Sequence, residues 1–87
     1  MPEISRFFGI TILMFFGDND PPHFHVTYSG QEAKIAIRTR EVIEGAISAR
    51  ALRLIKEWIE LHEQELLDNF EKIKNRREGW KKIEPLN

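Results

Sequence analysis

The chain has 87 residues, no cysteine and a formal net charge of −1 at pH 7, and 41% of its residues are hydrophobic. This length suits one domain with a single core over residues 1–87, and the absence of thiols excludes disulfides and cysteine–metal sites. A net charge near zero argues against general attraction to nucleic acid, so RNA binding would need a local basic patch.

Two strands are predicted at the start of the chain, over residues 3–8 and 10–17, where Ile, Phe and Leu dominate and Gly9 separates them. The apolar run 7–16 is too short to cross a bilayer, and the opening Met-Pro-Glu does not resemble a basic leader. We therefore expect a cytoplasmic protein without membrane contacts. The stretch GDNDPP that follows consists of turn-forming residues and predicts a loop.

A β-hairpin is predicted over residues 23–28 and 31–38, closed by a two-residue Ser-Gly turn. Such a turn pairs Val26 with Ala33, and Phe24 with Ile35. These pairs are apolar and can share the core-facing side of the sheet.

The opposite face of the same hairpin carries polar side chains. His25 is expected across from Lys34, with His23 and Arg38 farther along. Alternate residues of a strand point to the same side. The pattern therefore predicts that both imidazoles project together into solvent, away from the core and beside the ammonium of Lys34.

A further strand is predicted at 42–47, with Ser48 as the N-cap of a helix that begins at Ala49. After Glu63 the apolar arc rotates toward Leu67, which indicates either a break of the helix near residues 61–64 or a second apolar strip for a partner, and we favour the break. The helical pattern rests on one stripe of residues three and four apart, namely Leu52, Ile55, Ile59, His62, Leu66, Phe70 and Ile73.

These elements predict an α+β fold. A small antiparallel sheet of three to five strands in the N-terminal half would pack against one long or two shorter C-terminal helices.

The two histidines of the PPHFHV block allow three interpretations. They pack on the loop as structural residues, they act as acid and base around a phosphodiester, or they bind a metal with Asp18 and Asp20 as oxygen donors. Lys34 and Arg38 would hold phosphate in the catalytic interpretation, or would keep a strand edge soluble in the structural one. His62 lies in the helix stripe and is expected to be a neutral, hydrogen-bonded histidine at the core or its rim.

Four segments resemble one family of small bacterial proteins, Domain of Unknown Function 4160. They are MPEISRFFGI at the start, PPHFHV, ALRLIKEWIELHEQEL and the closing KKIEPL, and the resemblance extends over residues 1–86. Many relatives have N-D-H before the prolines, where this chain reads G-D-N-D, and this difference counts against a metal site. The matching positions are Pro2, Glu3, Ile4, Phe7, Pro21 to Val26, Trp58, His62, Glu65, Pro85 and Leu86.

The resemblance implies one half of a two-gene module of the toxin–antitoxin type, with a small antitoxin-like partner encoded nearby. Our leading hypothesis is the toxin-like component, acting on RNA as a metal-independent ribonuclease without a cofactor. His25 is the first candidate for the acid or base and His23 the second, while Lys34 and Arg38 are the candidates for substrate binding.

The alternative hypothesis is a non-enzymatic binding module, antitoxin-like or an adaptor. It would dock its partner through the PPHFHV face or through a helix strip formed by Leu54, Trp58 and Leu61.

Overall fold

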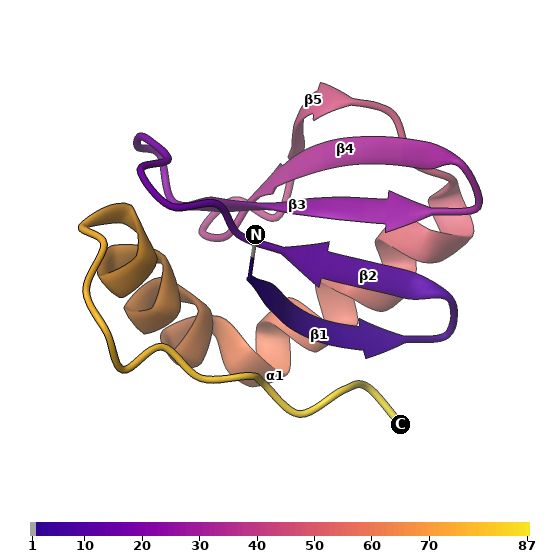
Figure 1. The fold of residues 1–87 in the computed structure, drawn as a ribbon. Coiled ribbons are helices and arrows are strands. Elements are labelled where there is room, and N and C mark those ends of the chain that lie inside the picture. The colour runs from indigo at the N-terminus through magenta and orange to yellow at the C-terminus, as the bar shows by residue number, and fades with distance from the viewer. Residues whose placement is uncertain (1) are drawn as a thin grey trace.

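The computed structural model describes residues 2–87 and shows a five-stranded sheet followed by one long helix (Figure 1). The predicted α+β fold is confirmed. No helix within these described residues is long and apolar enough to pass through a lipid bilayer. The elements are β1 (Glu3–Phe7), β2 (Ile10–Leu13), β3 (His23–Tyr28), β4 (Gln31–Ala36), β5 (Val42–Gly45) and α1 (Ala49–Lys74).

The sheet is antiparallel, and its strands are neighbours in the order in which they follow in the chain. The predicted register of the central hairpin is confirmed, since Val26 pairs with Ala33 and His25 with Lys34. The turn at Ser29 and Gly30 has positive φ at both residues, as a two-residue hairpin turn requires.

Four strands are shorter than the sequence predicts, and β1 and β5 end one and two residues early, at Phe7 and Gly45. β2 ends at Leu13, not at residue 17, because the chain leaves the sheet and forms a turn in which Asp18 N–H bonds the carbonyl of Phe15. β4 ends at Ala36, not at Arg38, because the Ala36 carbonyl accepts the N–H of Arg40 and reverses the chain.

Helix α1 begins as predicted after Ser48, whose hydroxyl accepts the backbone N–H of Ala51. The predicted break is present as a kink at His62, which has non-helical backbone angles within a helix that continues to Lys74. Figure 1 shows the first part of α1 behind the sheet and the last turns beyond the ends of the strands, on the side where β3 starts. The kink therefore lets one helix cover both the sheet and the loop before β3.

The core lies between the sheet and α1, and the C-terminal segment closes it. Trp58 is fully buried there, and its indole N–H donates to the carbonyl of Glu84. The predicted docking strip of Leu54, Trp58 and Leu61 is therefore not a continuous exposed surface, although Leu61 itself is exposed. The backbone N–H of Ile83 bonds the carbonyl of Ile4, so the C-terminal segment covers the edge of β1 (Figure 1).

Candidate functional site

The loop between β2 and β3 folds over the start of β3 and is fastened to the end of α1. The N–H of Gly17 bonds the carbonyl of Ile73, and Lys74 Nζ donates to Asp20 Oδ2 at 2.9 Å. The bond to Asp20 raises the pKa of Lys74. This attachment places Asp18 above the side chains that β3 presents.

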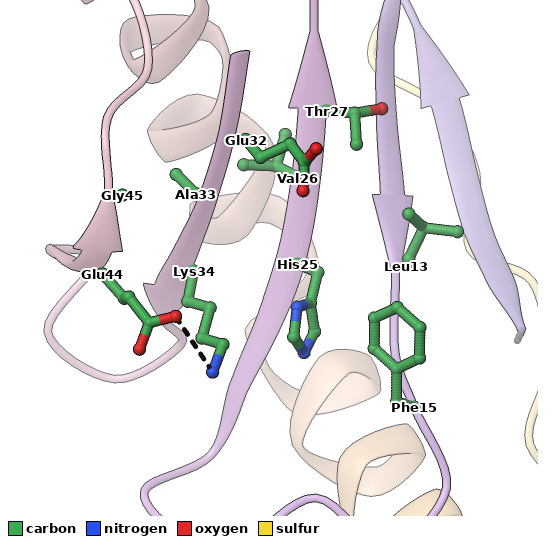
Figure 2. Close-up of a pocket in the computed structure, with 10 residues that line it drawn as sticks. All are labelled: Leu13, Phe15, His25, Val26, Thr27, Glu32, Ala33, Lys34, Glu44 and Gly45. Atoms are coloured by element: carbon green, nitrogen blue, oxygen red, sulfur yellow. Dashed lines mark ion pairs between the residues drawn. The ribbon is translucent and has the colours of Figure 1, made fainter. Parts of the chain in front are cut away.

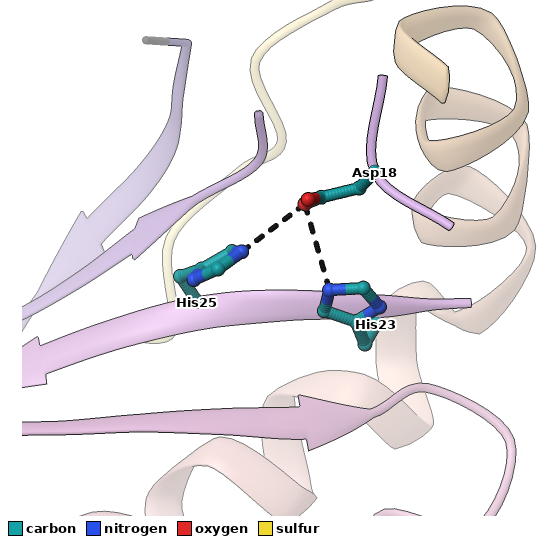
Figure 3. Close-up of side chains that lie close together, drawn as sticks. All are labelled: Asp18, His23 and His25. Atoms are coloured by element: carbon teal, nitrogen blue, oxygen red, sulfur yellow. Dashed lines mark hydrogen bonds and ion pairs between the residues drawn. The ribbon is translucent and has the colours of Figure 1, made fainter. Parts of the chain in front are cut away.

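Asp18 contacts both histidines through one carboxylate oxygen (Figure 3). Its Oδ2 lies 3.1 Å from Nε2 of His25 and 3.5 Å from Nε2 of His23. The two rings have centroids 5.4 Å apart and come from alternate positions of β3. The prediction that both imidazoles point to the same side is therefore confirmed.

The prediction that both rings open to solvent is wrong for His23, of whose side chain only 9% is exposed. Phe70 of α1 packs against the ring, with centroids 5.5 Å apart, because the kinked helix reaches past the end of the sheet. Nδ1 of His23 lies 2.8 Å from the carbonyl of Pro21 and donates to it, since a carbonyl only accepts. Nε2 of the same ring is buried and has no hydrogen-bond partner within residues 2–87.

His25 is half-buried at the rim of a pocket of about 410 Å³ on the sheet face opposite α1. The ring of Phe15 meets it at 80°, with centroids 4.2 Å apart. The pKa of His25 is lowered by burial, with smaller contributions from His23 and Lys34, although the hydrogen bond and charge of Asp18 act in the opposite direction. Figure 2 shows the imidazole between Phe15 and Lys34.

The two predicted phosphate ligands differ in position. Lys34 lines the pocket next to His25, but its ammonium pairs with Glu44 of β5 at 3.3 Å (Figure 2). Arg38 is exposed in the turn after β4 and does not line either pocket beside the histidines. The structure thus brings together three of the four predicted site residues, His23, His25 and Lys34.

The sequence predicts Asp18 only as an oxygen donor for a metal, and not as a partner of the two histidines in a catalytic site. The loop composition indicated a turn but not which carboxylate would face β3, because Asp20 is equally close in sequence and instead pairs with Lys74. Glu44 was missed altogether, since its place beside Lys34 depends on the irregular pairing of β4 with β5. His62 is separate from this cluster and bonds Glu65 at 2.7 Å.

Asp18, His23 and His25 also form a group with the composition of a metal site. One ligand atom from each lies within 4.8 Å of the others. Two imidazoles and one carboxylate are a donor set that proteins use for zinc and for non-haem iron.

Comparison with profiles of protein families assigns the chain to one family. The profile of the domain of unknown function DUF4160 matches residues 9–71 and includes both the PPHFHV block and the kinked half of the helix. The chain belongs to this family. No curated protein and no solved structure matches it. The DUF4160 assignment confirms the resemblance and brings no activity with it, so the function must be argued from the site.

Proposed function

We propose that this DUF4160 protein is the toxin-like component of a bacterial two-gene module and that it cleaves RNA in the cytoplasm without a metal cofactor. One observation carries the proposal: His25 is hydrogen-bonded to Asp18 at the rim of the pocket that Lys34 also lines. A base, the carboxylate that orients it and a nearby cation are the groups that phosphodiester cleavage uses.

The carboxylate of Asp18 fixes the tautomer of His25. Because Oδ2 accepts the Nε2–H proton, the lone pair of the neutral ring resides on Nδ1. In the proposed reaction Nδ1 takes the proton of a ribose 2′-hydroxyl, and the 2′-oxygen forms a bond to the adjacent phosphorus. The bond from phosphorus to the 5′-oxygen breaks, and the proton passes from the imidazolium to this leaving oxygen. The products are a 2′,3′-cyclic phosphate and a 5′-hydroxyl.

Lys34 is placed to neutralise the charge on the phosphate. Its pair with Glu44 is partly exposed, and such pairs contribute only about 0–1 kcal/mol. A phosphate can therefore replace Glu44 as the partner of the ammonium at little cost. We assign phosphate binding to Lys34 alone, because Arg38 lies outside the pocket.

To test this function, the protein is expressed in bacteria with and without its neighbouring gene, and growth is measured. Cleavage of RNA is measured separately with the purified protein. We expect the wild type to stop growth, and His25→Ala to reduce cleavage by roughly 10²–10⁴-fold, the usual contribution of a positioned base. The matched control is His62→Gln, which removes a histidine–carboxylate pair outside the pocket and should leave cleavage unchanged. Co-expression of the neighbour should restore growth.

Circular dichroism must show that the variants are folded. Unchanged cleavage by a folded His23→Ala/His25→Ala double variant would refute the enzymatic function.

The rival function is a non-enzymatic binding module, and one observation favours it. The outer edge of β5 has no strand partner within residues 2–87, and Ile43 on this strand is exposed. A partner strand could pair with such an edge. The same experiment separates the two functions, since a binding module would form a complex with the neighbouring gene product whether or not His25 is present, and would cleave no RNA.

A further inference from the structure

We propose that Asp18, His23 and His25 bind one divalent transition-metal ion of the zinc class. The ion would be held by Oδ2 of Asp18 and by Nε2 of each histidine, the three atoms that converge in Figure 3. Binding itself does not depend on the proposed ribonuclease activity. The effect of a bound ion on catalysis does depend on that activity.

The first argument is the environment of His23. Its Nδ1–H donates to the Pro21 carbonyl, so Nε2 of the neutral ring carries a lone pair. In this neutral form the lone pair faces a carboxylate oxygen that is 3.5 Å away, and no proton lies between the two atoms. Two acceptors repel each other in a buried place unless positive charge lies between them. A metal ion bound by both atoms supplies that charge.

The second argument is distance. Zinc binds histidine nitrogen and carboxylate oxygen at about 2.0–2.2 Å, so ligand atoms at tetrahedral angles lie about 3.4 Å apart. Oδ2 of Asp18 is 3.1 and 3.5 Å from the two Nε2 atoms. All three atoms lie within 4.8 Å of one another, so a small rotation of the half-buried His25 ring completes the arrangement.

The third argument is the support around the ligands. Histidines that bind metals usually donate their other N–H to a carbonyl or carboxylate, as His23 does to Pro21. Phe70 packs against the same ring and limits its movement. His23 is thus already oriented as a ligand, by a loop and a helix that are far apart in the sequence.

The fourth argument is charge. Nearby carboxylates have ammonium partners, Asp20 with Lys74 and Glu44 with Lys34, whereas within residues 2–87 Asp18 makes ion-pair contacts only with the histidines. An adjoining pocket of about 280 Å³, lined by Asp18 and His23 among others, gives an ion a path to the cluster.

The donor set selects the metal. Two imidazoles with one carboxylate suit Zn²⁺, Ni²⁺ and Fe²⁺, whereas Mg²⁺ and Ca²⁺ prefer oxygen ligands throughout. Three protein ligands leave a further position for water. Asp18, His23 and His25 supply these three ligands within this chain.

Metal binding would oppose the proposed catalysis. An ion on Nε2 of His25 displaces the proton that this atom donates to Asp18, and the ring then carries its proton on Nδ1. Nδ1 is the atom that takes the 2′-hydroxyl proton, so the metal-bound form has no base. Zn²⁺ should therefore inhibit cleavage of RNA.

The test titrates the full, tag-free chain with Zn²⁺ by calorimetry and with Co²⁺ by visible absorption. We expect one ion per chain, and binding at least about 100-fold weaker in Asp18→Asn, because loss of a direct ligand exceeds the effect of losing a supporting group. Asp18 lies on a partly exposed loop, so this variant should fold, whereas the buried His23 is less tolerant of substitution. The matched controls are His62→Gln and Asp68→Asn, whose side chains lie on α1 and within residues 2–87 bond only Glu65 and Gln64, and both should bind as the wild type does.

Two results would overturn the proposal. One is the absence of stoichiometric binding to the folded wild type, and the other is binding to folded Asp18→Asn that is as tight as binding to the wild type. Because no RNA is present, these results are independent of the ribonuclease hypothesis. If metal binds and the metal-free protein still cleaves no RNA, the metal site stands and the proposed function fails.

Discussion

A single buried amide, that of Asn69, fastens the C-terminal segment to α1. Its Nδ2 donates to the carbonyl of Lys81 at 2.6 Å, and its Oδ1 accepts the N–H of the same residue at 3.0 Å. The side chain thus satisfies a backbone donor and acceptor as a neighbouring strand would. From this position the chain continues to Ile83 and Glu84, which contact β1 and Trp58.

Replacing Asn69 by Ala should lower the free energy of unfolding by about 1–3 kcal/mol, because both backbone groups of Lys81 lose their partners near the core. Urea unfolding followed by circular dichroism measures this. Gln64→Ala is the matched control on the same helix, since that amide is exposed and bonds only Asp68. Its effect should stay within about 0.5 kcal/mol. Equal effects of the two substitutions would show that the two hydrogen bonds between Asn69 and Lys81 do not contribute to the free energy of unfolding.

At the scale of elements, the β4–β5 pairing shapes the pocket. Gly45 pairs with Ala33 and has φ of +80°. A Cβ at this position would collide with the backbone carbonyl oxygen of Glu32. The close approach holds β5 against β4, where Glu44 meets Lys34.

Gly45→Ala and Gly30→Ala form a matched pair, because their φ values are +80° and +81° but no atom lies within 4 Å of a Cβ on Gly30. Gly30→Ala should lower the free energy of unfolding by about 1 kcal/mol, the strain of a left-handed backbone. Gly45→Ala should lower it by about 1–3 kcal/mol more, since it adds the collision. Chemical denaturation of both variants measures the difference, and equal values would contradict the packing described for β5.

The register of the hairpin and the start of α1 were predictable because they depend on local signals: two-residue alternation, a Ser-Gly turn and a capping serine. The kink was predictable from the rotation of the apolar stripe after Glu63. The depth of His23 was not, because it depends on Phe70, which reaches the ring only after the helix bends. The partner of Lys34 depends likewise on an irregular strand pairing.

At the scale of the whole molecule, the site is assembled from three distant segments. The loop supplies Asp18, β3 supplies the histidines, and the end of α1 fastens the loop through Lys74 and packs Phe70 on His23. The two edges of the sheet differ, since the C-terminal segment covers β1 while β5 remains open within the described chain. The pocket beside His25 and the open edge of β5 therefore adjoin at Glu44.

The metal site depends on one claim, that Asp18 holds His23 and His25 as a unit, and the proposed ribonuclease depends on the contact of Asp18 with His25. Nitrogen–proton correlation spectra of the imidazole rings test it most directly, in the wild type, Asp18→Asn and Asp68→Asn. The account predicts that Asp18→Asn shifts the Nε2 resonances of both rings, while Asp68→Asn, which removes an exposed carboxylate of α1 that bonds only Gln64 in the described chain, leaves both in place. Spectra in which Asp18→Asn leaves either ring unchanged would contradict it.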